Sequence, residues 1–339
     1  MMNSRATPEP ANAAAPLFIV LNVRSSTYDA LKTREIIDGI LSAAGREHCL
    51  RIVTDATQLH DAARQTVDEA RARGGVVVAG GGDGTINAMA QATLGSGCSF
   101  GVLPLGTFNY FSRTHGIPVD TADATRLLLT ARAYPVQVGL ANDRVFLINA
   151  SLGMYPELLE DREAFNKKFG RTRLVAVVAG VVTILHHHRQ LRLFIEQGSS
   201  TRQMRTPVLF VGNNRLQLEQ AGVAGAPLLA QGQLDAITLR PMGTLTMLGL
   251  ALCGAFGQLG KAESVTSFAF GRIVVRPAMP YGSRRLKVAI DGEIVWLRAP
   301  IEFRVAAEAL HLLKPDPKSI ALQGTAKADL AAFPALVSA

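Results

Sequence analysis

Residues 76–87 read VVVAGGGDGTIN, an apolar strand that runs into a glycine turn and then into a helix. The three valines are typical of a strand buried on both faces. Glycine lacks Cβ, so the backbone of this turn can approach a ligand closely, and the N–H groups that open the next helix favour an anion. The stretch predicts a phosphate-binding turn. The alternative is an ordinary strand–helix turn in which Asp83 caps the helix.

Asp83 lies inside this turn, where a carboxylate would repel a phosphate. Its useful roles are to hold Mg²⁺, directly or through water, or to orient or deprotonate a nucleophile. The turn is not a Walker A loop, because no Gly-Lys-Ser/Thr follows it, and the G-x-G-x-x-G spacing of a dinucleotide site is missing.

The first half of the chain alternates strands and helices, which predicts a parallel sheet covered on both sides. The expected strands are Leu17–Asn22, Leu50–Thr54, Gly75–Ala79 and Phe100–Pro104, and the expected helices are Thr33–Ala44, Ala56–Arg73 and about Thr85–Leu94.

Beyond about Leu140, short strands with turn residues between them predict an antiparallel β-sandwich. They are Val145–Ser151, Leu191–Glu196, Thr206–Asn213, Leu234–Arg240, Phe268–Arg276, Leu286–Ile290, Ile294–Leu297 and Ile301–Val305, with helical insertions at Arg171–Leu185 and Thr244–Leu259. We therefore divide the chain into a tail (1–16), an α/β nucleotide-binding domain (17–140), a β-sandwich substrate domain (141–315) and an extension (316–339). The return of the last strand to the first domain is left open.

Composition restricts the partners. The 339 residues carry a formal charge of +8, with small basic groups at Arg162–Arg173 and Arg284–Lys287. Nucleic acid is disfavoured, because aromatic residues are only 6% and are not interleaved with basic runs. An anionic small molecule and an anionic membrane surface both remain open.

The cysteines and the apolar segments bear on the compartment. Three widely spaced cysteines without a C-x-x-C pair indicate a reducing compartment and argue against a disulfide framework or a zinc site. Because the first 16 residues lack an apolar core, we expect no secretory signal there. Met242–Leu259 is uncharged, and its glycines favour a buried or membrane-touching helix over a span. We expect a cytoplasmic protein, with peripheral contact at the inner membrane face left open.

Two glycine blocks together resemble a known family. Residues 81–87 (GGDGTIN) resemble the nucleotide-binding motif of the diacylglycerol kinase catalytic-domain superfamily, which includes bacterial lipid kinases and sphingosine kinases and is related to NAD kinases. Residues 101–113 (GVLPLGTFNYFSR) are similar to its second turn. A glycine turn on the adjacent strand would place Thr107 across the cleft from the first turn, outside the carboxyl ends of the parallel strands.

A third block, VAIDGE at residues 288–293, resembles the family's Asp-Gly-Glu turn, whose glutamate is taken as the general base. From the residues alone it is a hairpin that presents two carboxylates, with an ordinary Asp-Gly turn as the alternative. The resemblance implies a fold like that of NAD and diacylglycerol kinases.

The resemblance implies an ATP-dependent kinase that phosphorylates a lipid hydroxyl in phospholipid metabolism, with ATP and Mg²⁺ as cofactors. Glu293 would act as the base, and Asp83 would face the phosphates and the metal through water. Asp291 and Gly292 would form the second-domain turn. The implied partners are the lipid substrate and, transiently, an anionic membrane surface, but not nucleic acid; a homodimer is left open. The implied nucleotide-binding residues are Thr54, Gly81, Gly82, Asp83, Gly84, Thr85, Ile86, Asn87, Gly106, Thr107 and Asn109.

Some positions depart from the family pattern. Ala88 stands where a glutamate is usual, and Phe108 and Tyr110 replace a glycine and an aspartate. Gln231 replaces the aspartate of the family's structural metal site, and whether Asp235 substitutes for it is undecided. The alternatives are therefore a NAD kinase-like enzyme and a pseudokinase that senses a nucleotide or a lipid.

Overall fold

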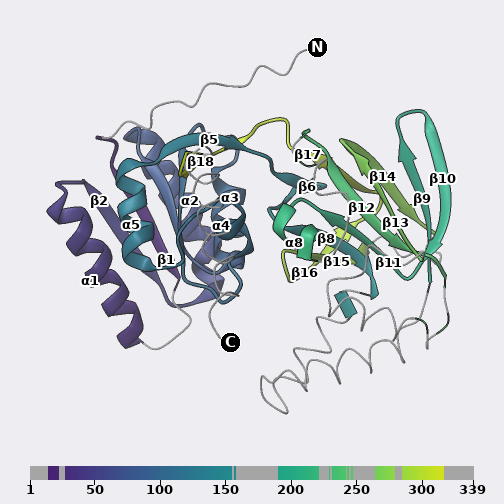
Figure 1. Ribbon diagram of the computed structural model, residues 1–339, viewed down its shortest axis with the longest axis horizontal. Coiled ribbons are helices and arrows are strands. Elements are labelled where there is room, and N and C mark those ends of the chain that lie inside the picture. The colour runs from purple at the N-terminus through teal and green to yellow at the C-terminus, as the bar shows by residue number, and fades with distance from the viewer. Residues whose placement is uncertain are drawn as a thin grey trace, which may run out of the picture. The chain divides into compact units, whose positions relative to one another are not determined.

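The computed structural model describes residues 14–22, 27–154, 156–157, 190–220, 229, 231–241, 243, 246, 264–278 and 285–316 (Figure 1). The described chain forms two compact units. Unit 1 contains residues up to Val136 and those from Glu308 onward, and unit 2 runs from Gln137 to Ala307.

Unit 1 is built on a six-stranded sheet. All its neighbouring strands pair in parallel except β5, which is antiparallel to β18. The strand order is β2 (His48–Val53), β1 (Leu17–Asn22), β3 (Val76–Gly81), β4 (Ser99–Pro104), β18 (Leu310–Lys314) and β5 (Arg132–Val136).

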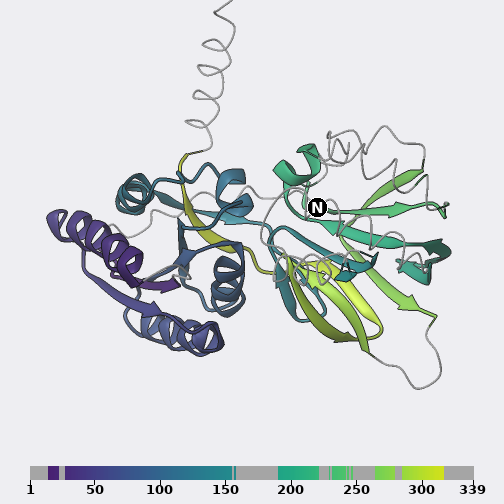
Figure 2. The same ribbon diagram turned by 90° about the horizontal axis from the view of Figure 1, so that it is seen from below.

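Helices lie on both sides of this sheet (Figures 1 and 2). On one face, Ile37 of α1 and Leu128 of α5 pack against Ile19 and Val78. On the other face, α2 contacts β1 and α3 contacts β3. Burial of both faces explains why β3 is continuously apolar. The helices are α1 (Thr27–Ala43), α2 (Leu59–Ala72), α3 (Asp83–Thr93) and α5 (Thr121–Thr130), with the short η1 (Ala56–Gln58) and α4 (Tyr110–Thr114).

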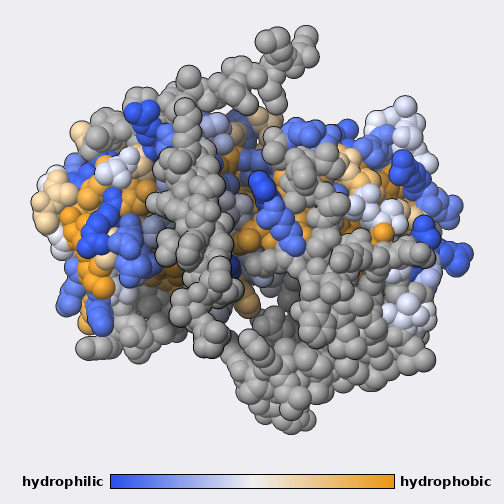
Figure 3. All heavy atoms as spheres, viewed as in Figure 1, coloured by the Kyte–Doolittle hydropathy of each residue, from blue (hydrophilic) through white to orange (hydrophobic). Residues whose placement is uncertain are grey.

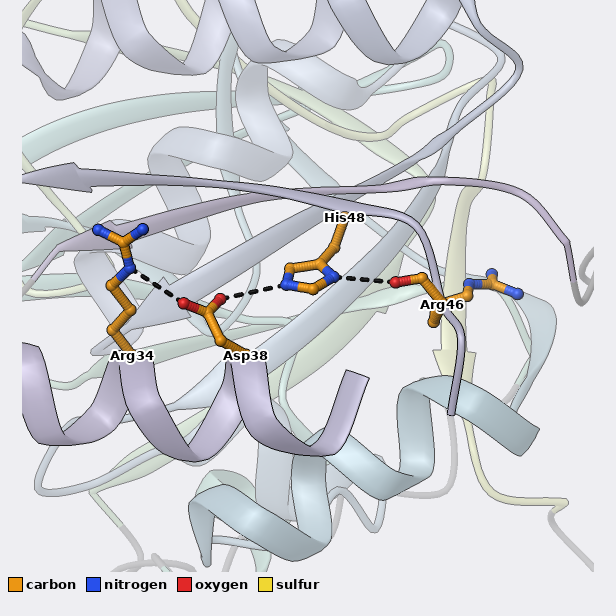
Figure 4. Close-up of polar contacts among 4 residues, drawn as sticks. All are labelled: Arg34, Asp38, Arg46 and His48. Atoms are coloured by element: carbon orange, nitrogen blue, oxygen red, sulfur yellow. Dashed lines mark hydrogen bonds and ion pairs between the residues drawn. The ribbon is translucent and has the colours of Figure 1, made fainter. Parts of the chain in front are cut away.

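A polar network joins α1 to the edge strand β2 (Figure 4). Arg34 Nε donates to Asp38 Oδ2 at 3.0 Å, and His48 Nε2 lies 3.1 Å from Asp38 Oδ1. His48 Nδ1 lies 2.9 Å from the carbonyl oxygen of Arg46. Both ring nitrogens therefore face oxygens that only accept, so the two contacts are simultaneous hydrogen bonds when the imidazole is protonated.

Unit 2 is a sandwich of two six-stranded sheets in which every pairing is antiparallel. Alternate residues of both sheets fill the core, for example Leu209 and Val288 from one sheet and Ile195 and Phe303 from the other. One sheet has the order β10 (Ser200–Thr206), β9 (Leu191–Gln197), β14 (Arg272–Pro277), β17 (Ile301–Val305), β6 (Gly139–Ala141) and β7 (Arg144–Phe146). The other has the order β13 (Val265–Phe270), β12 (Leu234–Leu239), β11 (Val208–Gly212), β8 (Asn149–Gly153), β15 (Arg285–Ile290) and β16 (Glu293–Arg298), and α8 (Arg215–Gln220) follows β11.

The predicted fold class is confirmed, since an α/β unit with a mostly parallel sheet precedes an antiparallel sheet unit. Several element boundaries differ from the predictions. The predicted strand Phe268–Arg276 is two strands, β13 and β14, which separate at Gly271 and join different sheets, and Val145–Ser151 is divided between β7 and β8. The last strand, β18, lies in the sheet of unit 1, and the unit boundary falls at Val136 instead of residue 140.

Two other predictions fall almost wholly outside the described residues, namely the helical insertions and the stretch Met242–Leu259. Among the helices that are described, none is both long and apolar enough to cross a membrane. On the face in Figure 3, hydrophilic and hydrophobic residues are interspersed over the described surface, as is usual for folded proteins.

Candidate functional site

The ends of four parallel strands gather the predicted nucleotide-binding residues of unit 1. Because β1 to β4 run in parallel, Asn22, Val53, Gly81 and Pro104 all lie at the same edge of the sheet. This carboxyl edge is where open α/β sheets bind ligands.

The two glycine turns touch through their backbones. Leu105 N–H donates to the carbonyl of Gly81 at 2.9 Å. A Cβ on Gly106 would lie only 2.7 Å from Cα of Gly82 and 2.8 Å from Asn109 Oδ1. A side chain at residue 106 would therefore push the turns apart, which explains the glycine in physical terms.

Asn109 holds the second turn in shape. Its Oδ1 accepts from Gly106 N–H at 3.0 Å, and its Nδ2 donates to Gly106 O at 2.8 Å. The residue is 2% exposed and has φ of 49°, a left-handed conformation in which asparagine is favoured among residues other than glycine. Asn109 therefore shapes the turn and has little side-chain surface for a ligand.

Asp83 connects the first turn to the helix that follows the second. Its carboxylate accepts from the backbone N–H of Tyr110 at 3.3 Å and of Phe111 at 3.4 Å, at the start of α4. Burial raises the pKa of this carboxyl, and the N–H donors of Phe111, Tyr110 and Asn109 oppose that rise. No pattern in the sequence indicates this bridging role.

The donor set around Asp83 fits Mg²⁺ that is held mainly by phosphates and water. Carboxylate oxygens are hard ligands, and the amide contacts of Tyr110 and Phe111 to the two oxygens are long, at 3.3 and 3.4 Å. The described part of the chain has no group of three or more His, Cys, Asp or Glu residues that could hold a metal ion. Mg²⁺ typically binds nucleotide enzymes through one or two carboxylates plus the substrate phosphates.

Asn22 belongs to the same edge, although the predicted site residues did not include it. Its Nδ2 donates to Thr85 Oγ1 at 2.9 Å, and Thr85 is 7% exposed. The position of Asn22 as the last residue of β1, beside β3, is the signal that could have indicated this contact. The Thr85 hydroxyl is thus turned toward the protein.

The remaining predicted residues of unit 1 differ in exposure. Ile86 is fully buried and its N–H donates to Gly82 O at 3.0 Å, so Ile86 has no polar group left for a nucleotide and anchors α3 instead. Thr54 and Thr107 are exposed. Asp55, beside Thr54, caps η1 by accepting from Thr57 N–H at 2.9 Å.

The predicted hairpin turn lies in unit 2. Asp291 and Gly292 join β15 to β16 with φ of 47° and 87°. Positive φ at both central residues is the mark of a type I′ turn, the usual two-residue hairpin connection. Glu293 opens β16 opposite Ile290, and it is exposed.

The Asp291 side chain anchors this turn to the segment that leads into β8. Its carboxylate accepts from the backbone N–H of Leu147 at 2.8 Å and from those of Ile148 and Asn149 at 2.9 Å each. Asp291 N–H in turn donates to Asn149 O at 2.9 Å. The prediction of two presented carboxylates is therefore corrected to one, because Asp291 accepts from the backbone, whereas Glu293 is exposed.

Asp235 is a buried acid on β12 near Gln231, which is exposed. Asp235 is 1% exposed, and neither of its carboxylate oxygens has a hydrogen-bond partner among the described residues. Burial raises its pKa to about 6 from an ordinary value of 3.8.

We expect Asp235→Asn to stabilise the protein at neutral pH. Between pH 3.8 and about 6 the folded state binds more protons than the unfolded state, so the contribution of Asp235 to stability falls as pH rises through that window. Asparagine removes the buried charge. The free energy of unfolding of the variant should therefore exceed that of wild type by about 3 kcal/mol at pH 8, and the difference should vanish near pH 4. Urea unfolding at both pH values measures it, with Asp143→Asn at an exposed site as the control. A variant less stable than wild type at pH 8 would show that the ionised carboxylate has a partner.

Comparisons with known proteins found a family match that covers both glycine turns of unit 1. The diacylglycerol kinase catalytic domain family matches residues 16–141. A "Probable lipid kinase YegS-like" of Klebsiella pneumoniae (strain 342) is 37% identical over 32% of this chain and 35% of its own length. The uncharacterized protein sll0036 of Synechocystis is 27% identical over 70% of this chain and 54% of its own length. The chain thus spans only about a third to a half of these two relatives.

A third relative and a solved structure match more fully. The crystal structure of a diacylglycerol kinase from Bacillus anthracis str. Sterne shares the fold, with a TM-score of 0.66 and 18% identity over 90% of this chain and 98% of that chain. A "Probable lipid kinase YegS-like" of Pseudomonas aeruginosa (strain UCBPP-PA14) is 31% identical over 80% of this chain and 86% of its own length. With a relative of that identity matched over most of both lengths, and with a diacylglycerol kinase catalytic domain at residues 16–141, the chain belongs to the YegS-like family of probable lipid kinases.

Proposed function

We propose that this kinase uses ATP and transfers the γ-phosphoryl group to the hydroxyl of a lipid of the diacylglycerol, sphingoid or glycerolipid type. The observation that supports it best is the pair of glycine turns, which Asp83 and Gly106 hold together at the carboxyl edge of the unit 1 sheet. We further propose that it acts in the cytoplasm and reaches its substrate at a membrane.

The first turn of α3 is suited to the phosphates. The first backbone bond of the helix runs from Ile86 N–H to Gly82 O, so the N–H groups of Asp83, Gly84 and Thr85 precede it. Such N–H groups lack intrahelical acceptors and bind anions well. Thr107, exposed on the second turn, would contact the nucleotide with its hydroxyl. Mg²⁺, bound with ATP near Asp83, would supply neutralisation of phosphate charge.

Glu293 is the proposed general base. It would accept the proton of the lipid hydroxyl as the oxygen attacks the γ-phosphorus and the bond to the β-phosphate oxygen breaks. The rest of the rate enhancement would come from positioning and charge stabilisation, which dominate phosphoryl transfer.

The proposal is tested by supplying γ-labelled ATP with a panel of lipids or with NAD and identifying products by mass spectrometry. We expect label in a phospholipid product and none in NAD. Label in NAD would replace this proposal with the NAD kinase-like alternative. Binding of ATP without label in any product would favour the pseudokinase, for which Ala88, Tyr110 and Gln231 are the motivating departures.

A further inference from the structure

The open end of the hairpin formed by β15 and β16 carries an unusual pair of cations. Arg285 stands directly opposite Arg298, and both are exposed. Like charges at opposed positions of an antiparallel pair are destabilising. Among the described residues neither arginine forms an ion pair, in contrast to Arg272 and Arg276 of β14, whose partners are Glu302 and Glu196. An external anion would relieve this repulsion.

Trp296 lies on the same hairpin, opposite Lys287. It is 60% exposed, more than any other large hydrophobic side chain in the described part of the chain. The Lys287 ammonium lies 5.7 Å from the centre of the indole ring and 3.3 Å from both carboxylate oxygens of Glu157. The ammonium thus makes a cation–π contact with the indole ring, and most of the Trp296 side chain is exposed to water.

Strand alternation places these side chains together. Val295 and Leu297 face the core of the sandwich, so Trp296 and Arg298 face outward, as do their partners Lys287 and Arg285. We call these four residues the outer-face cluster. Glu293 is on the core-facing side, about 10 Å along the strand from Trp296. The cluster is therefore separate from the proposed base.

We propose that the outer-face cluster is a docking surface for an anionic lipid membrane. Tryptophan settles at the membrane–water interface, where its ring is apolar and its N–H remains hydrated. Arg285 and Arg298 beside it would meet the negative lipid headgroups, whereas Lys287 is paired with Glu157 and contacts the indole ring. The positive sign of the cluster disfavours a second copy of the chain, because a symmetric contact would bring like charges together. This inference rests on the proposed function insofar as a lipid substrate resides in a membrane.

Trp296 is the single tryptophan of the chain, so its fluorescence reports on the cluster directly. With vesicles of phosphatidylcholine and phosphatidylglycerol we expect a blue-shifted emission that brominated lipid quenches and salt weakens. Vesicles of phosphatidylcholine alone should have little effect. An unchanged emission with anionic vesicles, or a larger shift with an oligonucleotide, would overturn the proposal.

The double variant Arg285→Gln and Arg298→Gln tests the charge. Loss of two interfacial cations should weaken vesicle binding by about 30-fold. The matched control is Arg272→Gln with Arg276→Gln, which removes the same charge from the other sheet. Equal binding of the two double variants would contradict the proposal.

An activity assay separates this inference from the proposed function. With a lipid dispersed in neutral detergent micelles, the Arg285 and Arg298 double variant should phosphorylate as fast as wild type. Vesicle binding without phosphorylation of any lipid would remove the proposed function and leave the docking surface. If the wild-type protein phosphorylates lipid in micelles but does not bind anionic vesicles, the proposed function stands and the docking surface is ruled out.

Discussion

Glu293→Gln is expected to lower kcat by roughly 10²- to 10⁴-fold, the usual contribution of a general base. Glutamine keeps the shape of the side chain and cannot take the proton of the lipid hydroxyl. Because Glu293 is exposed and opens β16 after the turn, the change should leave the thermal stability unaltered. The KM for ATP should also stay close to the wild-type value, since the proposed nucleotide-binding residues belong to unit 1.

Initial rates at saturating lipid, together with a thermal melt, check this expectation. Glu219→Gln is a matched control, because it removes the same charge from an exposed ion pair on α8. If Glu293→Gln keeps more than a tenth of the wild-type kcat, the base lies elsewhere. Asp83 is then the next candidate, because burial already raises the pKa of its carboxyl.

The sequence was most informative where a local pattern determines a local structure. The valines of β3 and the glycines after them predicted a buried strand and a turn into a helix, and the Asp-Gly pair at Asp291 and Gly292 predicted a hairpin. Each of these features depends on residues within a few positions of one another. The fold class could therefore be predicted from the order of such elements.

The partners of the two aspartates could not be predicted in this way. Asp83 accepts from amides 27 and 28 residues away, and Asp291 from amides 142 to 144 residues away. A carboxylate in a turn gives no sign of whether distant N–H groups will occupy it. The sequence therefore suggested a substrate-facing role for Asp291, where the structure shows three backbone contacts, and it gave no sign of the backbone contacts that Asp83 makes.

Four strands were not predicted, namely β5, β6, β10 and β18, and the reasons are clearest for β10 and β18. β10, with the sequence STRQMRT, is an edge strand with mostly exposed polar residues, so it lacks the apolar alternation of a half-buried strand. β18 is a short apolar segment that pairs with β4, more than two hundred residues earlier in the chain. Only the tertiary fold determines such a pairing.

The second large effect is expected at Asp291. Asp291→Gly removes the acceptor of three backbone N–H groups, which belong to the buried residues Leu147, Ile148 and Asn149. Each buried donor without a partner costs about 1–3 kcal/mol, so the loss of three should lower the free energy of unfolding by roughly 3–9 kcal/mol. Denaturant unfolding followed by Trp296 fluorescence measures this loss in unit 2.

The Asp291→Gly variant distinguishes two roles for Asp291, one conformational and one as an anchor of the turn. The φ of 47° favours glycine over aspartate, so a purely conformational role predicts that Asp291→Gly is neutral or stabilising. An anchoring role predicts a large loss despite the favourable φ. The stability of Asp291→Asn should fall between those of wild type and the glycine variant. Asparagine tolerates this φ and keeps one acceptor, but it turns an NH₂ group toward a backbone N–H. A loss below about 1 kcal/mol for the glycine variant would show that the three hydrogen bonds contribute little. The turn before Glu293 would then be held mainly by its own backbone conformation.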